Sequence, residues 1–64
     1  MSVRAEIWDT ARELLRDKGD KAEAECDARQ AKAEADGDLF SANSWFHIRQ
    51  AIGRLRRGER RPPD

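Results

Sequence analysis

The sequence predicts an all-α domain, a compact three-helix bundle with a short basic tail at its C-terminal end. The first supporting observation is a repeated dipeptide, Gly19-Asp20 and Gly37-Asp38. Glycine takes the left-handed conformation that ends a helix, and aspartate caps the N-terminus of the next one. The second is the spacing of apolar residues by three and four positions, which is typical of amphipathic helices. We therefore expect helices at about residues 3–18, 20–36 and 38–57.

The first predicted helix, residues 3–18, carries one continuous apolar stripe. Val3, Ile7, Ala11 and Leu14 follow one another at intervals of four, four and three residues. Charged side chains occupy the opposite side, so the segment has the pattern of a helix that buries one face.

The second predicted helix, residues 20–36, contains no large apolar residue. Asp20 and Glu23 match a variant of the capping box in which aspartate is the cap. Small residues form two stripes on nearly opposite sides: Ala22, Cys26 and Ala33 on one, and Ala24, Ala28, Ala31 and Ala35 on the other. The pattern admits either stripe as the buried one. We place Ala24, Ala28 and Ala31 in the predicted core.

The third predicted helix, residues 38–57, begins at the cap Asp38. Its main apolar seam consists of Trp45, Ile48, Ile52 and Leu55, and a weaker stripe consists of Leu39, Ala42, Phe46 and Gly53. The main seam does not account for Phe40 or Phe46. The full predicted core consists of Val3, Ile7, Trp8, Ala11, Leu14, Leu15, Ala24, Ala28, Ala31, Trp45, Ile48, Ile52 and Leu55.

The length of 64 residues is that of one small domain. We expect the domain to span residues 1–57 and a disordered tail to span residues 58–64, because Gly58 and the Pro62-Pro63 pair end any helix. The N-terminus lacks the apolar segment of a signal peptide, and no apolar run approaches the ~20 residues of a membrane span. We therefore expect a cytoplasmic protein that does not bind membranes.

Catalytic, metal-binding and nucleotide-binding motifs are missing from the sequence. Cys26 and His47 are the only residues of their types, and a zinc site needs three or four ligands. Ser41 and Ser44 fall in the first turns of a predicted helix, where serine is common for capping reasons. We therefore predict neither an enzyme nor a cofactor, metal or small-molecule substrate.

The net charge is zero, but it is unevenly distributed. Residues 1–36 hold seven basic and ten acidic residues, whereas residues 37–64 hold six arginines and three acidic residues. The arginines near the C-terminus have three interpretations. They complement the helix dipole, contact phosphates of a nucleic acid, or dock on an acidic partner protein.

The order of residues resembles a group of small helical proteins of alphaproteobacteria whose function is undefined. The resemblance covers residues 8–55, and it depends on Trp8, on the Gly37-Asp38 turn and on the closing pattern Trp45-x-x-Ile48-x-x-Ala51-Ile52-x-x-Leu55. The chain departs from the group at Cys26 and Gln30, where the group prefers alanine. The resemblance implies a bacterial, cytoplasmic protein and no particular activity.

Our first functional hypothesis is a non-enzymatic protein-interaction or small regulatory module, with self-association as one form of that interaction. The alternative is a nucleic-acid-binding protein that uses the arginines of the third helix and the tail. The first hypothesis follows from the small core and from apolar residues outside the main seam. The expected partner-binding residues are Phe40, Phe46, Arg49, Arg54, Arg56 and Arg57.

Overall fold

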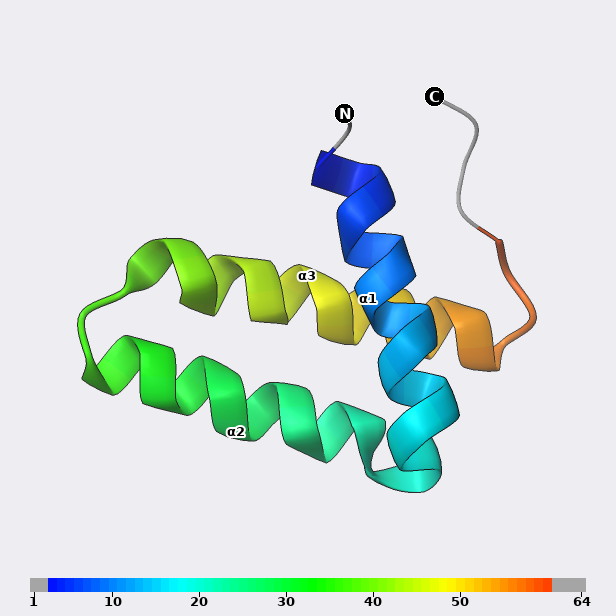
Figure 1. Ribbon diagram of the computed structural model, residues 1–64, viewed down its shortest axis with the longest axis horizontal. Coiled ribbons are helices and arrows are strands. Elements are labelled where there is room, and N and C mark those ends of the chain that lie inside the picture. The colour runs from blue at the N-terminus through cyan, green and yellow to red at the C-terminus, as the bar shows by residue number, and fades with distance from the viewer. Residues whose placement is uncertain (1–2, 61–64) are drawn as a thin grey trace.

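The structure, a computed structural model, describes residues 3–60 and confirms the all-α class. It contains α1 (Val3–Lys18), a 3-10 turn η1 (Gly19–Lys21), α2 (Ala22–Ala35) and α3 (Leu39–Arg56), with no strand in the described part. Helices α2 and α3 run antiparallel to each other as a hairpin, and α1 crosses α3 steeply (Figure 1). Most inter-helix contacts involve α3, and α1 and α2 touch each other little. The element that both other helices pack against is therefore α3.

The first junction differs from the prediction. Helical backbone runs without a break through residues 3–35, so the chain has two unbroken helical stretches where the sequence predicts three separate helices. The first stretch bends sharply at η1, where Gly19 has a φ of 56° (Figure 1). The predicted capping box is wrong, because the positions that precede η1 and α2 make no side-chain cap bond. Asp20 lies within the 3-10 turn, and the Ala22 N–H donates to the backbone of Gly19 instead.

The second junction follows the prediction. Gly37 has a φ of 77°, its N–H donates to Glu34 at 3.1 Å, and the next N–H, from Asp38, donates to Ala33 at 2.8 Å. This pair of bonds is the Schellman motif that closes a helix on a glycine. The Asp38 carboxylate then accepts a bond from the Ser41 N–H at 3.1 Å, which caps α3. Bonds from the Ser41 side chain and then from its backbone lower the pKa of Asp38.

Helix α3 ends by the same glycine mechanism. Gly58 has a φ of 83° and donates to Leu55 at 3.0 Å, while the Glu59 N–H donates to Arg54 at 3.0 Å. These bonds position the first residues of the predicted tail. Residues 1–2 and 61–64, which include the Pro62-Pro63 pair, lie outside the described residues, so the disorder of the tail stays a prediction.

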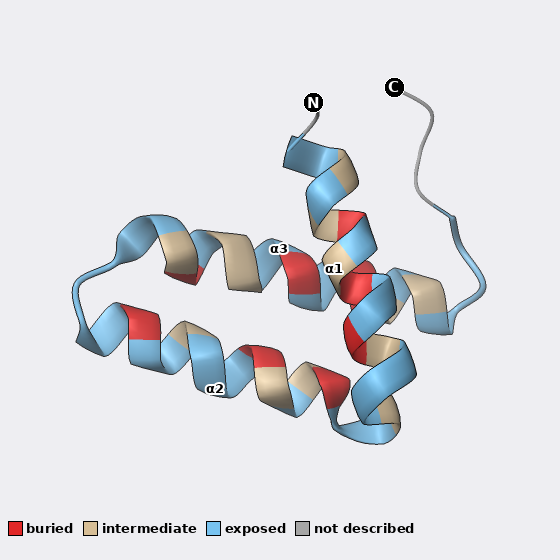
Figure 2. Ribbon diagram, viewed as in Figure 1, coloured by how far each residue is buried: buried red, intermediate tan, exposed pale blue. Residues whose placement is uncertain are grey.

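The core lies on both packed sides of α3 (Figure 2). Its buried apolar residues are Trp8, Ala11, Leu14, Ala22, Cys26, Ala33, Ala42, Ile48, Ala51 and Ile52. Ile7, Leu15, Trp45 and Leu55 pack against this core and are partly buried. The main seam of α3 and most of the α1 stripe are thus where the sequence predicts them.

Two parts of the predicted core are wrong. Val3 is 66% exposed, because the first turns of α1 extend past α3 (Figure 1). Helix α2 also buries the opposite stripe, so that its three predicted core alanines, Ala24, Ala28 and Ala31, are exposed.

Charged residues of α2 make contacts with α3 in this orientation. With Cys26 inward, Asp27 reaches Arg49 of α3, and the Arg29 guanidinium lies 4.9 Å from the centre of the Trp45 ring. Arg29 also pairs with Glu25 at 3.2 Å. The opposite orientation of α2 would turn Arg29, which lies on the buried side of the helix, away from Trp45. Burial, followed by the nearby charge of Asp27, raises the pKa of the Cys26 thiol.

Candidate partner-binding surface

All six predicted partner-binding residues lie on α3 or at its C-terminal end. Because α1 and α2 cover two sides of this helix, its remaining side faces outward. The structure places the six residues in three environments: arginines that pair with carboxylates, one arginine that does not, and exposed aromatic side chains.

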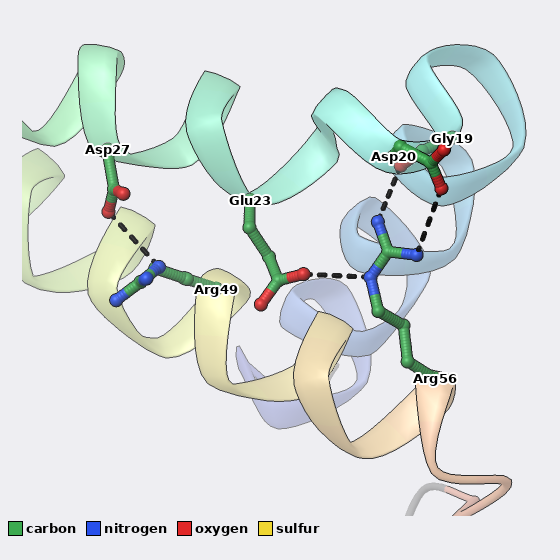
Figure 3. Close-up of polar contacts among 6 residues, drawn as sticks. All are labelled: Gly19, Asp20, Glu23, Asp27, Arg49 and Arg56. Atoms are coloured by element: carbon green, nitrogen blue, oxygen red, sulfur yellow. Dashed lines mark hydrogen bonds and ion pairs between the residues drawn. The ribbon is translucent and has the colours of Figure 1, made fainter.

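Arg56 holds the first turn to the end of α3 (Figure 3). Its Nε donates to Glu23 Oε1 at 2.7 Å, and its Nη2 donates to the Gly19 carbonyl at 2.6 Å. Nη1 lies 3.9 Å from Asp20 Oδ1, and the Arg56 side chain is 31% exposed. The guanidinium thus satisfies a carbonyl at the bend and links η1, α2 and α3. This geometry gives Arg56 a role in the fold.

Two other arginines also have carboxylate partners. Arg49 Nε lies 3.1 Å from Asp27 Oδ1 and ties α3 to α2 (Figure 3), whereas Arg57 Nε pairs locally with Glu59 Oε2 at 3.1 Å. Both arginine side chains are about half exposed or more, so each pair contributes little to stability. Part of their positive charge is nevertheless balanced within the fold.

Arg54 differs from the other three. Within residues 3–60 its guanidinium takes part in no ion pair, and its side chain borders two open grooves. The outer groove has a volume of about 420 Å³ and is lined by Glu23, Phe46, Arg49, Gln50, Gly53, Arg54 and Arg57. The crossing groove has a volume of about 520 Å³ and is lined by Val3, Arg4, Ile7, Trp8, Asn43, His47, Gln50, Ala51 and Arg54.

Three large apolar side chains of α3 face solvent. Leu39 is 72% exposed, Phe40 80% and Phe46 42%. The Phe46 ring packs edge to face against His47, with 5.5 Å between ring centroids. Leu39 and Gly53 were not among the predicted site residues. Both residues belong to the weaker apolar stripe of α3, whose spacing places them on the same side of the helix as Phe46.

The residues that the structure describes bear on two further kinds of site. Residues 3–60 contain no group of three or more His, Cys, Asp or Glu side chains that could hold a metal ion. No helix of this part combines the length and apolar character needed to cross a membrane. Cys26 is fully buried within the core. The outward side of α3, with its two grooves and exposed apolar side chains, is the clearest candidate surface.

No known protein family, curated protein or solved structure matches this chain. The resemblance to small alphaproteobacterial helical proteins therefore stays an expectation, and the case for a function depends on the geometry of the α3 surface.

Proposed function

We propose that the chain is a non-enzymatic protein-interaction module that binds its partner through the outward side of α3. The observation that carries this proposal is the exposure of Leu39 and Phe46 on one side of a well-packed helix. Apolar surface gains about 25 cal/mol per Å² when it leaves water, so covering these side chains favours association. The outer groove beside Phe46 provides a hollow into which a partner side chain fits.

The charge around this surface favours a partner with acidic groups. Arg54 borders both grooves and makes no ion pair with another described residue. Glu23 is the only acidic residue that lines either groove, and it already accepts a bond from Arg56. Protein interfaces commonly have an apolar centre and a polar rim, and arginine is enriched in them.

Nucleic-acid binding has weaker support from the same geometry. Phosphate contacts require available cationic side chains. Arg49, Arg56 and Arg57 each lie beside a carboxylate, which a nucleic acid would have to displace. The exposed apolar residues would also remain uncovered. We therefore rank the alternative second and test both together.

Site-specific photo-crosslinking in the source cell tests the proposal. A crosslinker is placed at Phe46, and a matched crosslinker at Glu13, an exposed residue of α1, serves as the control. We expect a protein adduct from position 46 only, unchanged by nuclease. Equal adducts from both positions, or adducts that nuclease removes, would contradict the proposal.

The substitution Phe46→Ala provides a second test. Phe46 is already partly exposed, so the variant should keep its helical circular dichroism while losing the protein adduct from a crosslinker at Gln50 in the same groove. If Phe46→Ala lowers the thermal stability and leaves the adduct intact, Phe46 acts as a core residue and the proposal loses its basis.

A further inference from the structure

We infer that the crossing groove binds an acidic and apolar segment of the partner protein, whose carboxylates pair with Arg4 of α1 and Arg54 of α3. The groove lies where the N-terminal half of α1 crosses α3 (Figure 1). This inference rests on the proposed function and names the chemistry of the partner at a part of the surface that Phe46 does not line. It is carried by the ion pairing of the arginines and by the residues of the two groove walls.

Most arginines of the structure have a carboxylate partner, and two of the exceptions meet at this groove. The described arginines that pair with an aspartate or glutamate are Arg12, Arg16, Arg29, Arg49, Arg56 and Arg57. Within residues 3–60 the remaining arginines, Arg4, Arg54 and Arg60, take part in no ion pair. Arg4 and Arg54 come from different helices and line the same groove. The groove therefore gathers positive charge that the described part of the fold leaves unbalanced.

The α3 wall of the groove is a line of polar side chains. It contains Asn43, His47, Gln50 and Arg54. Their intervals of four, three and four residues place them on one side of the helix. None of the described residues that line the groove, on either helix, is acidic. A carboxylate that enters the groove therefore meets amide and guanidinium donors and no negative charge, and a guanidinium can bind it through two parallel hydrogen bonds.

The α1 wall supplies apolar surface beside Arg4. Val3, Ile7 and Trp8 line the groove, and Val3 is 66% exposed. Apolar walls exclude water, so they strengthen the attraction between the arginines and a carboxylate, and they favour a ligand that brings an apolar side chain to cover them. A nucleic acid would supply the negative charge but leave this apolar surface in water. The groove therefore favours a protein segment that is both acidic and apolar.

The crossing groove borders the outer groove of the proposed partner surface. Gln50 and Arg54 line both grooves. Phe46 lines only the outer groove, whose other arginines, Arg49 and Arg57, already pair with carboxylates of the fold. The two grooves thus differ in what they offer a partner. A segment that covers Phe46 reaches unbalanced positive charge by extending past Arg54 into the crossing groove.

A photo-crosslinker at Asn43 identifies the occupant in the source cell, because Asn43 lines the crossing groove and not the outer one. We expect a protein adduct, and mass-spectrometric mapping should place the crosslink in a segment of a different protein that contains both acidic and apolar residues. A crosslinker at Glu13, an exposed residue of α1, is the matched control and should give no such adduct. No adduct at Asn43, an adduct in a segment without acidic residues, an adduct to nucleic acid or an adduct to a second copy of this chain would each overturn the inference.

Charge reversal tests the two arginines. The mapped segment is prepared as a synthetic peptide and titrated calorimetrically, and Arg4→Glu and Arg54→Glu should each weaken its binding by about tenfold or more. Both arginines are exposed, so the variants should keep the helical circular dichroism of the wild type. Arg16→Glu, at the far end of α1, is the matched control and should leave the affinity unchanged.

Exchanging the charges on both sides sharpens this test. A peptide whose acidic residues are replaced by lysine should bind the double variant of Arg4→Glu and Arg54→Glu more tightly than it binds the wild type. If either single reversal leaves the affinity of the acidic peptide unchanged, or if the lysine peptide prefers the wild type, the arginines do not pair with the carboxylates of the partner.

The two tryptophans report where the peptide binds. Trp8 lines the crossing groove, whereas the Trp45 ring lies against Arg29 of α2. Adding the acidic peptide should therefore shift the indole N–H signal of Trp8 in nuclear magnetic resonance spectra and leave that of Trp45 in place. A shift confined to Trp45, or equal shifts of both signals, would place the peptide elsewhere and overturn the inference.

The outcomes separate this inference from the proposed function. A protein adduct from position 46 together with any of the contrary results at Asn43, Arg4 or Arg54 overturns only the chemistry assigned to the crossing groove. The absence of a position-specific adduct at both Phe46 and Asn43 overturns the inference and the proposed function together.

Discussion

The two Gly-Asp dipeptides have the same sequence and form different turns. At Gly37-Asp38 the glycine completes a Schellman motif and the aspartate caps the next helix with its side chain. At Gly19-Asp20 the glycine also has a positive φ, but the aspartate falls inside a 3-10 turn and caps nothing. The second turn is closed by its own residues, whereas the first is held from outside by Arg56.

The position of the aspartate explains the difference. The chain leaves helical conformation at Gly37, with a φ of 77°, and at Asp38, with a ψ of 81°, so the Asp38 carboxylate can reach the Ser41 N–H. At the first turn helical conformation resumes at once after Gly19, and no residue is free to act as a cap. The dipeptide thus specifies a change of direction, and the residues after it decide whether a cap forms.

The largest expected effect comes from the glycines themselves. Gly19→Ala and Gly37→Ala should each lower the free energy of unfolding by about 1–2 kcal/mol, because a Cβ is disfavoured at positive φ. Neither position has an atom within 4 Å of the added Cβ, so backbone strain is the whole cost. Denaturant unfolding measures it.

Gly53→Ala is the control for this prediction, because Gly53 lies inside α3 and has no positive φ. It should raise the free energy of unfolding by up to about 1 kcal/mol. If Gly19→Ala costs nothing while Gly37→Ala costs the expected amount, the bend can relax around alanine and the two turns differ more than their φ angles indicate.

The glycine signals and the apolar spacing were sufficient to predict the all-α class, the second turn and the main seam of α3. They could not decide which α2 stripe is buried, because alanine at both stripes gives equal local signals. That choice depends on packing against residues distant in sequence, such as the contact of Arg29 with Trp45. The first junction also has a contact distant in sequence, because Arg56 donates to the Gly19 carbonyl from 37 residues away.

The second-largest expected effect concerns the bonds between Arg56 and the first turn. Arg56→Met should lower the free energy of unfolding by about 1 kcal/mol, because it removes the bonds to Gly19 and Glu23 from a partly exposed site. Arg57→Met, which loses only a local contact with Glu59, should change it by less than about 0.5 kcal/mol. If chemical denaturation shows the same loss in free energy of unfolding for Arg56→Met and Arg57→Met, Arg56 does not stabilise the bend.

The arginines of the candidate surface also differ in ways that depend on contacts distant in sequence. Arg49, Arg54, Arg56 and Arg57 look equivalent in the sequence, and composition alone gives no reason to separate them. The structure separates them by what lies within reach: a turn carbonyl and Glu23 for Arg56, a carboxylate of α2 for Arg49, and no described ion-pair partner for Arg54. Helix geometry could have selected Leu39 and Gly53, since both belong to the weaker α3 stripe that contains Phe46.

The smallest expected effect is the pH dependence of the cap that only the second turn possesses. The bonds from Ser41 lower the pKa of Asp38 below its usual value of 3.8, so the folded state favours the ionised carboxylate. This contribution to stability is present above about pH 4 and is lost as the pH falls through the lowered pKa. Asn is a comparable cap without charge, so the stability difference between wild type and Asp38→Asn isolates the charge.

Thermal unfolding between about pH 2 and pH 6 measures this difference. The wild type should be the more stable protein at pH 6, and the two melting temperatures should converge as the pH approaches 2. The melting temperature of Asp20→Asn should differ from that of the wild type by the same amount at every pH in this range. The reason is that the Asp20 carboxylate caps no helix and lies, fully exposed, 3.9 Å from Arg56. If the melting temperature of Asp20→Asn converges with that of the wild type at low pH as much as that of Asp38→Asn does, the two aspartates contribute alike to their turns.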